Sequence, residues 1–158
     1  MSKDSQMILH RGETLPLLKN PAHPGVWQKK LMDTQEADKM NVGVNALLLE
    51  RLMPRGGLLP HVHPESCEVI CLTKGRVRAY YDGAWHNHAA GDVFIVPAGV
   101  LHAVVNQGDT PTEQLSFFLP NDYDKKNVWF QTDIQDAPSV KGLLDPAPDR
   151  AHEEESAQ

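Results

Sequence analysis

The sequence predicts an all-β fold, a barrel or a sandwich built from short strands. Between Val42 and Pro120, short apolar or alternating runs are separated by turn signals rich in Gly, Pro, Asn and Asp. No segment of that region has the spacing of a convincing amphipathic helix. The pair Asp82-Gly83 is a strong hairpin signal, because a tight primed turn needs positive φ and glycine supplies it without strain. Such a pattern is typical of closed or two-layered β architectures.

The first part of the chain, residues 1–41, is expected to be an irregular extension that could carry an edge strand. Turn signals occur at Asn20-Pro21 and at Pro24-Gly25. Residues 26–32 alternate loosely in the manner of a strand, and the polar residues 33–39 predict a loop or a short helical turn.

The barrel itself is expected over residues 42–120. Its first strand covers residues 42–52 and ends at the turn Pro54-Arg55-Gly56-Gly57. The later strands are expected over residues 68–72, 76–81, 85–88, 93–96, 102–106 and 114–119.

Residues 121–158 are predicted to form a C-terminal extension. The apolar residues 128–130 are expected to pack back against the barrel. Roughly the last 14 residues, from Asp145 onward, are acidic and contain proline, which predicts disorder.

Length and charge limit the class of protein. The 158 residues and 17.6 kDa suit one domain with a sizeable core. The net charge of −6 argues against a nucleic-acid surface, which needs clustered Lys and Arg. No apolar run approaches the ~20 residues of a membrane helix. The start of the chain has no apolar signal core behind basic residues, so a cytoplasmic protein is expected.

The two cysteines, Cys67 and Cys71, are not expected to form a disulfide. On one strand they would lie ~13 Å apart, which is too far for a bridge. A zinc site would need further cysteines at short spacing, and the chain has none. We expect two partly buried thiols on the outer face of a sheet.

The stretch from His61 to Glu68 holds the candidate site. His61 and His63 would point to the same face of an extended strand, with Cα atoms roughly 6.5 Å apart. Glu68 opens the apolar run of the next strand, and His102 follows the corner Pro97-Ala98-Gly99. Three imidazoles and one carboxylate suit a divalent transition metal, Fe(II), Mn(II), Ni(II), Cu(II) or Zn(II), at one ion per chain.

These residues resemble the first motif of the cupin superfamily. That motif runs Gly, five residues, His-x-His, three or four residues, Glu, six residues, Gly, and His61, His63, Glu68 and Gly75 fall on it. The leading Gly is absent. Arg55 occupies its place, before Gly56 and Gly57, which predicts a turn shifted by one residue.

The second cupin motif runs Gly, five residues, Pro-x-Gly, two residues, His, three residues, Asn. It is matched without a gap by Gly91, Pro97, Gly99, His102 and Asn106. The short segment between the motifs is similar to that of small single-domain cupins. The resemblance implies a double-stranded β-helix, the cupin or jelly-roll β-barrel, usually a homodimer, with His61, His63, Glu68 and His102 holding a metal inside.

Several other polar residues are less suited to the candidate site. The second His-x-His pair, His86 and His88, lies on the return strand of the predicted hairpin without an acidic partner spaced like Glu68, so it is not expected to bind the metal. Glu65 is expected to be solvated or to lie at the mouth. Asn106 is expected to be a buried hydrogen-bonding group. The isolated His10 and His23 are expected on the surface.

The function expected from this resemblance is a small-molecule metalloenzyme of the dioxygenase or decarboxylase type. Its substrate would bind the metal through oxygen atoms, and a non-catalytic binding or sensing module is the alternative. No general acid or base is evident inside the barrel beyond the ligands. Arg55, expected at the mouth, could pair with a substrate carboxylate or simply be solvated. The expected interior walls are Ile70, Leu72, Val93 or Phe94, Val104, and Phe117 or Phe118.

Overall fold

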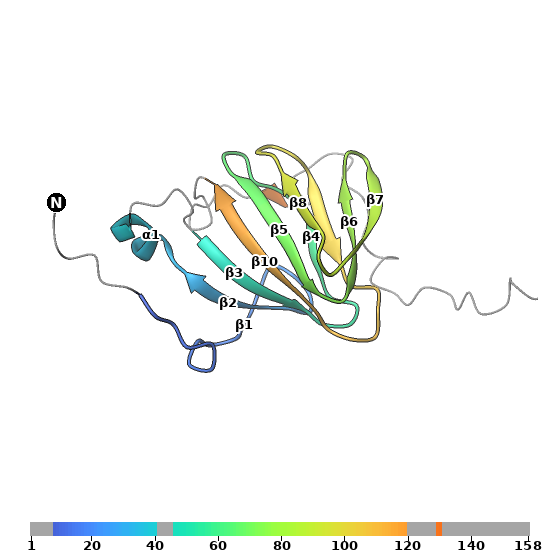
Figure 1. The fold of residues 1–158 in the computed structure, drawn as a ribbon. Coiled ribbons are helices and arrows are strands. Elements are labelled where there is room, and N and C mark those ends of the chain that lie inside the picture. Colours follow the sequence, from blue (N-terminus) through green and yellow to red (C-terminus); the bar gives the residue numbers. More distant parts are fainter. Residues whose placement is uncertain (1–7, 41–45, 120–128, 131–158) are drawn as a thin grey trace, which may run out of the picture.

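The fold consists of two antiparallel sheets that face each other as a double-stranded β-helix (Figure 1). The computed structural model describes residues 8–40, 46–119 and 129–130. The first sheet contains, in spatial order, β1 (Leu18–Lys19), β2 (Val26–Met32), β3 (Ala46–Leu52), β10 (Thr112–Leu119), β5 (Cys67–Lys74) and β8 (Val93–Val96). The second sheet contains β11 (Trp129–Phe130), β4 (Gly57–Val62), β9 (His102–Val105), β6 (Arg76–Tyr81) and β7 (Ala84–Ala89).

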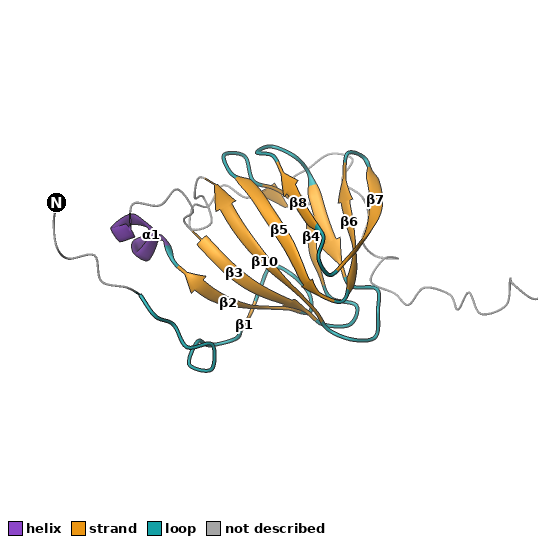
Figure 2. Cartoon of the chain, viewed as in Figure 1, coloured by secondary structure: helices purple, strands orange, loops and turns teal. Residues whose placement is uncertain are grey.

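The described part contains one helix, α1 (Thr34–Met40), which follows β2 and lies away from β6 and β7 (Figure 2). The Asp33 side chain accepts a hydrogen bond from the Glu36 amide at 2.9 Å, and the Glu36 carboxylate accepts one from the Asp33 amide at 3.0 Å. This reciprocal capping starts the helix in a segment where the sequence predicted a loop or a short helical turn. No helix in the described ranges is long and apolar enough to cross a membrane.

Alternation of side chains explains how the first sheet builds the interior. In both β3 and β10 every second residue is buried. The register places Glu50 opposite Gln114, and Phe118 lies beside Ala46 on one side and Glu68 on the other. The inner face of this sheet therefore carries polar as well as apolar groups.

The apolar core fills the space between the two sheets. Its largest cluster contains residues from both sheets, namely Val26, Leu52, Leu58, Ile70, Leu72, Val77, Ala79 and Val104. The predicted walls Ile70, Leu72 and Val104 are thus confirmed. Of the paired alternatives, Phe94 packs on the core whereas Val93 is 57% exposed, and Phe118 is 3% exposed.

Four chain segments meet at one end of the barrel. His61 on β4 pairs with His102 on β9, and Glu68 on β5 pairs with Val96 at the end of β8. The amide of Gly99 donates to the His63 carbonyl at 2.9 Å, which ties the loop before β9 to the end of β4. Residues from distant parts of the sequence are thereby gathered at this end.

The strands predicted from the sequence are present wherever the structure describes them. The strand expected over residues 26–32 is β2, and β11 pairs with β4, so Trp129 and Phe130 do return to the barrel. Cys67 and Cys71 are free and partly buried on β5, as expected. Residues 42–45 of the predicted barrel strand and the tail expected to be disordered lie outside the described residues.

Arg55 is exposed, which agrees with the solvated alternative, but the expectation that it lies at the mouth is wrong. Its amide donates to the Asn106 carbonyl, which follows the end of β9, so Arg55 lies at the end of the barrel opposite His102 and not at the mouth. Arg55 itself has φ of 60°, so the left-handed position has not shifted to Gly56 or Gly57. Those two glycines serve close packing instead, since a Cβ on Gly57 would lie 2.7 Å from the Val104 carbonyl oxygen.

Candidate metal centre

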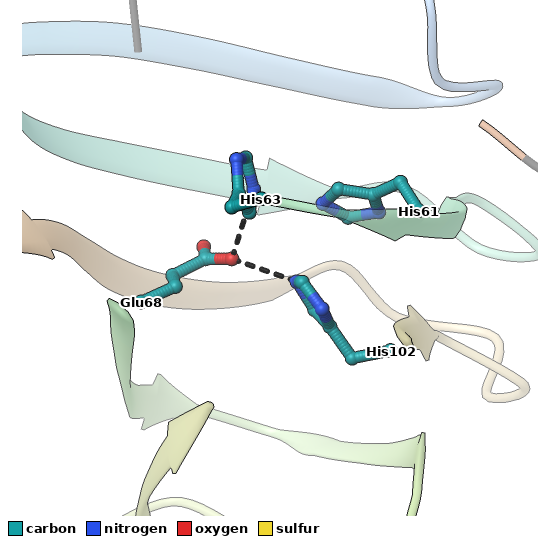
Figure 3. A group of neighbouring side chains, drawn as sticks. All are labelled: His61, His63, Glu68 and His102. Atoms are coloured by element: carbon teal, nitrogen blue, oxygen red, sulfur yellow. Dashed lines mark hydrogen bonds and ion pairs between the residues drawn. The ribbon is translucent and has the colours of Figure 1, made fainter. Parts of the chain in front are cut away.

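The structure gathers His61, His63, Glu68 and His102 into one buried cluster (Figure 3). One ligand atom from each residue lies within 4.8 Å of the others. The four residues are only 4%, 6%, 2% and 1% exposed, respectively. Imidazole nitrogens and a carboxylate oxygen at such separations could hold one metal ion.

Each side chain reaches the cluster from a strand or from the residue beside one. His61 is on β4, His63 directly follows that strand, Glu68 is on β5, and His102 begins β9. The His61 ring centroid lies 4.9 Å from that of His63 and 4.2 Å from that of His102. Because His61 and His102 are cross-strand partners, the sheet itself fixes part of the cluster.

Backbone carbonyl groups orient two of the three imidazoles. The Nδ1–H group of His61 donates to the Leu59 carbonyl at 2.6 Å, and that of His102 donates to the Val100 carbonyl at 3.0 Å. A carbonyl oxygen only accepts, so Nδ1 must carry the proton in both rings. A metal would be bound through the Nε2 atoms, of which that of His102 also lies 2.9 Å from Oε2 of Glu68, and the carbonyl groups hold both rings in the required orientation.

The Glu68 carboxylate lies between two histidines, as Figure 3 shows. Its Oε2 atom is 2.9 Å from Nε2 of His102 and 3.5 Å from Nε2 of His63. Burial opposes ionisation, but the hydrogen bonds and charges of these histidines outweigh it and hold the pKa of Glu68 well below its usual range. Glu68 is therefore an anion, which is the form that binds metals.

His61 is kept in its neutral, metal-binding form. Burial lowers the pKa of His61 well below its usual value, and the charges of His102, His23 and His63 lower it further. A neutral imidazole offers a lone pair to a metal without first losing a proton. Three nitrogens and one anionic oxygen therefore fit a divalent transition metal.

The second His-x-His pair belongs to a different, largely aromatic group. His86 stacks on Tyr81 at 4.3 Å and His88 stacks on Phe94 at 4.8 Å. The Nε2 atom of His88 is hydrogen-bonded to the Tyr81 hydroxyl at 3.1 Å, and its Nδ1 atom is 3.5 Å from Asp92. Among the residues that the structure describes, neither histidine joins a group that could hold a metal.

The other residues weighed from the sequence lie away from the cluster or beside it. Glu65 is exposed. Asn106 is 1% exposed, and its amide donates to the carbonyl groups of Leu52 and Thr110, so its predicted role as a buried hydrogen-bonding group is confirmed. His10 is exposed and pairs with Glu36 at 2.7 Å.

The expectation that His23 lies on the surface is wrong. It is 7% exposed, and its ring centroid is 5.2 Å from that of His61. Burial is the main reason that the pKa of His23 falls to about 4. The turn residues around His23 gave no sign of this, because its burial depends on contacts with a distant part of the chain.

Sequence reasoning also missed a second buried carboxyl group. Glu50 on β3 is 4% exposed, and its Oε2 atom accepts hydrogen bonds from Gln114 at 2.8 Å and Ser116 at 2.9 Å. Burial, followed by the charge of Glu68, raises the pKa of Glu50 to about 7. The barrel thus does hold an acid–base group besides the cluster. The alternation of Glu50 with the apolar residues Leu48 and Leu52 was the signal that could have revealed its burial.

Comparison with known proteins agrees with the motifs. A family model described as "Cupin domain" matches residues 48–118. Auxin-binding protein ABP19b of Prunus persica is 32% identical over 123 residues, which cover 64% of this chain and 59% of that protein. The chain spans less than two thirds of the length of the first curated relatives that it matches.

Solved structures agree on the fold. The polyketide cyclase RemF from Streptomyces resistomycificus has a TM-score of 0.68 at 16% identity, covering 87% of this chain and 94% of that one. A predicted oxalate decarboxylase from Thermotoga maritima has a TM-score of 0.64 at 19% identity, covering 72% of this chain and all of that one. Residues 48–118 are therefore similar to cupin domains, and the chain shares the fold of these solved structures.

Proposed function

We propose that this protein binds one divalent transition metal per chain and is a small-molecule metalloenzyme of the dioxygenase or decarboxylase type. The observation that carries the proposal is the buried cluster of three histidines and one glutamate, whose ligand atoms lie within 4.8 Å of one another. His61, His63, Glu68 and His102 would hold the ion. When bound, it would act as a Lewis acid toward substrate oxygens or as the place where dioxygen is activated.

The ligand count supports a catalytic rather than a structural role. Fe(II), Mn(II) and Ni(II) commonly take six ligands, and four protein ligands leave positions for a substrate. A chelating substrate would use hydroxyl, keto or carboxylate oxygens for this purpose.

The surroundings of the cluster favour a substrate with an apolar body. The Phe118 ring packs against His63 with centroids 5.0 Å apart. Ile70, which is fully buried, follows Glu68 on the same face of β5. Apolar walls of this kind lower the local dielectric, and that strengthens each electrostatic contact made there.

Glu50 supports proton transfer as part of the chemistry. A carboxyl group with a pKa of about 7 exists in both its protonated and ionised forms near neutral pH. Its two hydrogen-bond donors, Gln114 and Ser116, fix its position on the inner face of the barrel. A decarboxylation needs such a donor, since the carbon that loses carbon dioxide must take up a proton.

Metal analysis tests the site. The purified protein, His61→Ala and Glu68→Ala would be compared by elemental analysis, with His86→Ala as the matched histidine control. We expect about one metal per chain in the unaltered protein and in the control, and little metal in the two cluster variants. Equal metal content in all four proteins would contradict the site.

Turnover tests the reaction class. The Fe(II) and Mn(II) forms would be screened against catechols, β-diketones and keto acids, with oxygen uptake and carbon dioxide release recorded together. Oxygen uptake that Glu68→Ala abolishes indicates a dioxygenase, and carbon dioxide release without oxygen uptake indicates a decarboxylase. Binding of these compounds without either product would identify a non-catalytic module and refute the enzymatic part of the proposal.

A further inference from the structure

His23 lies in a turn between β1 and β2, outside the matched cupin domain at residues 48–118. Two backbone hydrogen bonds attach this turn to the residue after β3 and to the first residue of β4. The Pro24 carbonyl accepts from Gly57 and the Gly25 carbonyl accepts from Met53, each at 2.9 Å. The attachment is close, since a Cβ on Gly25 would lie 2.8 Å from the Cα atom of Gly56.

The His23 ring is held in one tautomer. Its Nδ1 atom lies 2.9 Å from the backbone nitrogen of Leu59, and a backbone N–H group can only donate. Nδ1 must therefore be the acceptor and carry no proton. An imidazolium ring could not accept this bond, which agrees with the burial of His23.

Leu59 connects His23 to the candidate metal ligand His61. Its amide donates to His23 at 2.9 Å, while its carbonyl accepts the Nδ1–H group of His61 at 2.6 Å. The two rings also lie against each other, with centroids 5.2 Å apart and planes tilted by 51°. One residue of β4 thus positions both rings.

We propose that His23 is a positioning residue, which fixes the Leu59 backbone by its hydrogen bond and thereby holds His61 in its metal-binding orientation. The inference rests on the proposed metal site. It gives the N-terminal segment a part in metal binding, although that segment lies outside the matched cupin domain. Groups that orient a ligating histidine typically contribute 10- to 100-fold to metal affinity.

Two variants separate the hydrogen bond from the packing of the ring. His23→Leu keeps a similar side-chain volume but offers no acceptor to the Leu59 amide. His23→Asn is smaller but keeps an oxygen that can accept this bond. His10→Ala is the matched control, because His10 is an exposed N-terminal histidine that pairs with Glu36.

The experiment is a titration of each metal-free protein with Co(II), followed by visible absorption and checked by competition with Zn(II). We expect His23→Leu to bind Co(II) about 10- to 100-fold more weakly with an altered spectrum, and His23→Asn and His10→Ala to stay within about threefold of the unaltered protein. Thermal unfolding shows whether the variants are folded. If His23→Leu does not fold, His23→Ala takes its place.

The outcomes distinguish this inference from the proposed function. No Co(II) binding by the unaltered protein would refute the metal site itself. Normal binding by His23→Leu would overturn the positioning role alone. A loss in His23→Asn as large as that in His23→Leu would also overturn it, because the ring and not the hydrogen bond would then be the important feature.

Discussion

Two buried carboxyl groups on the inner face of the same sheet have opposite properties. Glu68 on β5 and Glu50 on β3 are 2% and 4% exposed, and both are hydrogen-bonded. The pKa of Glu68 lies well below its usual range, whereas that of Glu50 is raised to about 7. Burial raises the pKa in both cases, so the difference comes from the neighbours.

The neighbours of Glu68 are imidazoles, and those of Glu50 are an amide and a hydroxyl. Hydrogen bonds and electrostatic interactions with His102 and His63 favour the ionised form of Glu68. Gln114 and Ser116 offer hydrogen bonds without charge, which do not offset the burial of Glu50. Pairs of acids whose pKa values are driven apart commonly divide the work of a site, one binding or stabilising charge and the other moving protons.

The largest effect is expected when the charge of Glu68 is removed. Glu68→Gln keeps the shape of the side chain but loses the anionic ligand, so Co(II) or Zn(II) affinity should fall about a hundredfold or more. Glu50→Gln should leave the affinity within about threefold. Competition titration measures both, and an equal loss in the two variants would show that the groups do not have separate roles.

A pH-dependent difference in stability is expected for Glu50. Its pKa is raised from 4.5 to about 7 in the folded protein, so the folded state holds a proton that the unfolded state releases between these values. The stabilising contribution is complete below pH 4.5 and is lost as the pH rises through about 7. The shift corresponds to about 3 kcal/mol in the free energy of unfolding.

The measurement is the difference in unfolding free energy between the metal-free protein and Glu50→Gln across pH 4.5 to 8. The difference is needed because the lowered pKa values of His23 and His61 make stability rise with pH over part of this window. We expect Glu50→Gln to become relatively more stable as the pH rises. A constant difference across the range would mean that Glu50 is ionised in the folded protein throughout.

The smallest effect is expected for Ser116→Ala. Loss of its hydrogen bond to Glu50 should lower the free energy of unfolding by about 1 kcal/mol. Since this bond lowers the pKa of Glu50, the variant should also move the pH-dependent loss to higher pH. Thr73→Ala is the control, because it removes an exposed hydroxyl bonded to the Glu113 carbonyl. Urea unfolding at several pH values should show this change in the pH dependence of the unfolding free energy only for Ser116→Ala.

The candidate site could be predicted because its residues have fixed spacings along the chain. His61, His63 and Glu68 lie within one strand–turn–strand segment, and His102 follows a Pro-x-Gly corner. The same spacing did not mark His86 and His88 as ligands. Their pair lies within a regular hairpin, where His88 contacts an exposed aspartate, Asp92. A His-x-His pair alone is therefore not sufficient, and the longer spacings to Glu68 and His102 are what identified the candidate site.

The missed residues depend on packing between distant segments. His23 is buried because its turn is bonded to Met53 and Gly57, and no pattern around His23 announces that contact. Glu50 could have been assigned to the interior from the alternation in β3, but its hydrogen-bond partners lie 64 and 66 residues away. Arg55 was placed at the wrong end because the motif gives spacing without the direction of the barrel axis.

The central position of β10 makes the first sheet depend on contacts that are distant in sequence. This strand pairs with β3 on one side and β5 on the other, joining Thr112 to Leu52 and Phe118 to Glu68. These contacts are far apart in sequence, and folds dominated by such contacts form slowly, in milliseconds to seconds. On a ribosome, a chain that has not yet exposed residues 112–119 already carries all four cluster residues but lacks the strand between β3 and β5. The first sheet therefore becomes continuous from β3 to β5 only once residues 112–119 have paired.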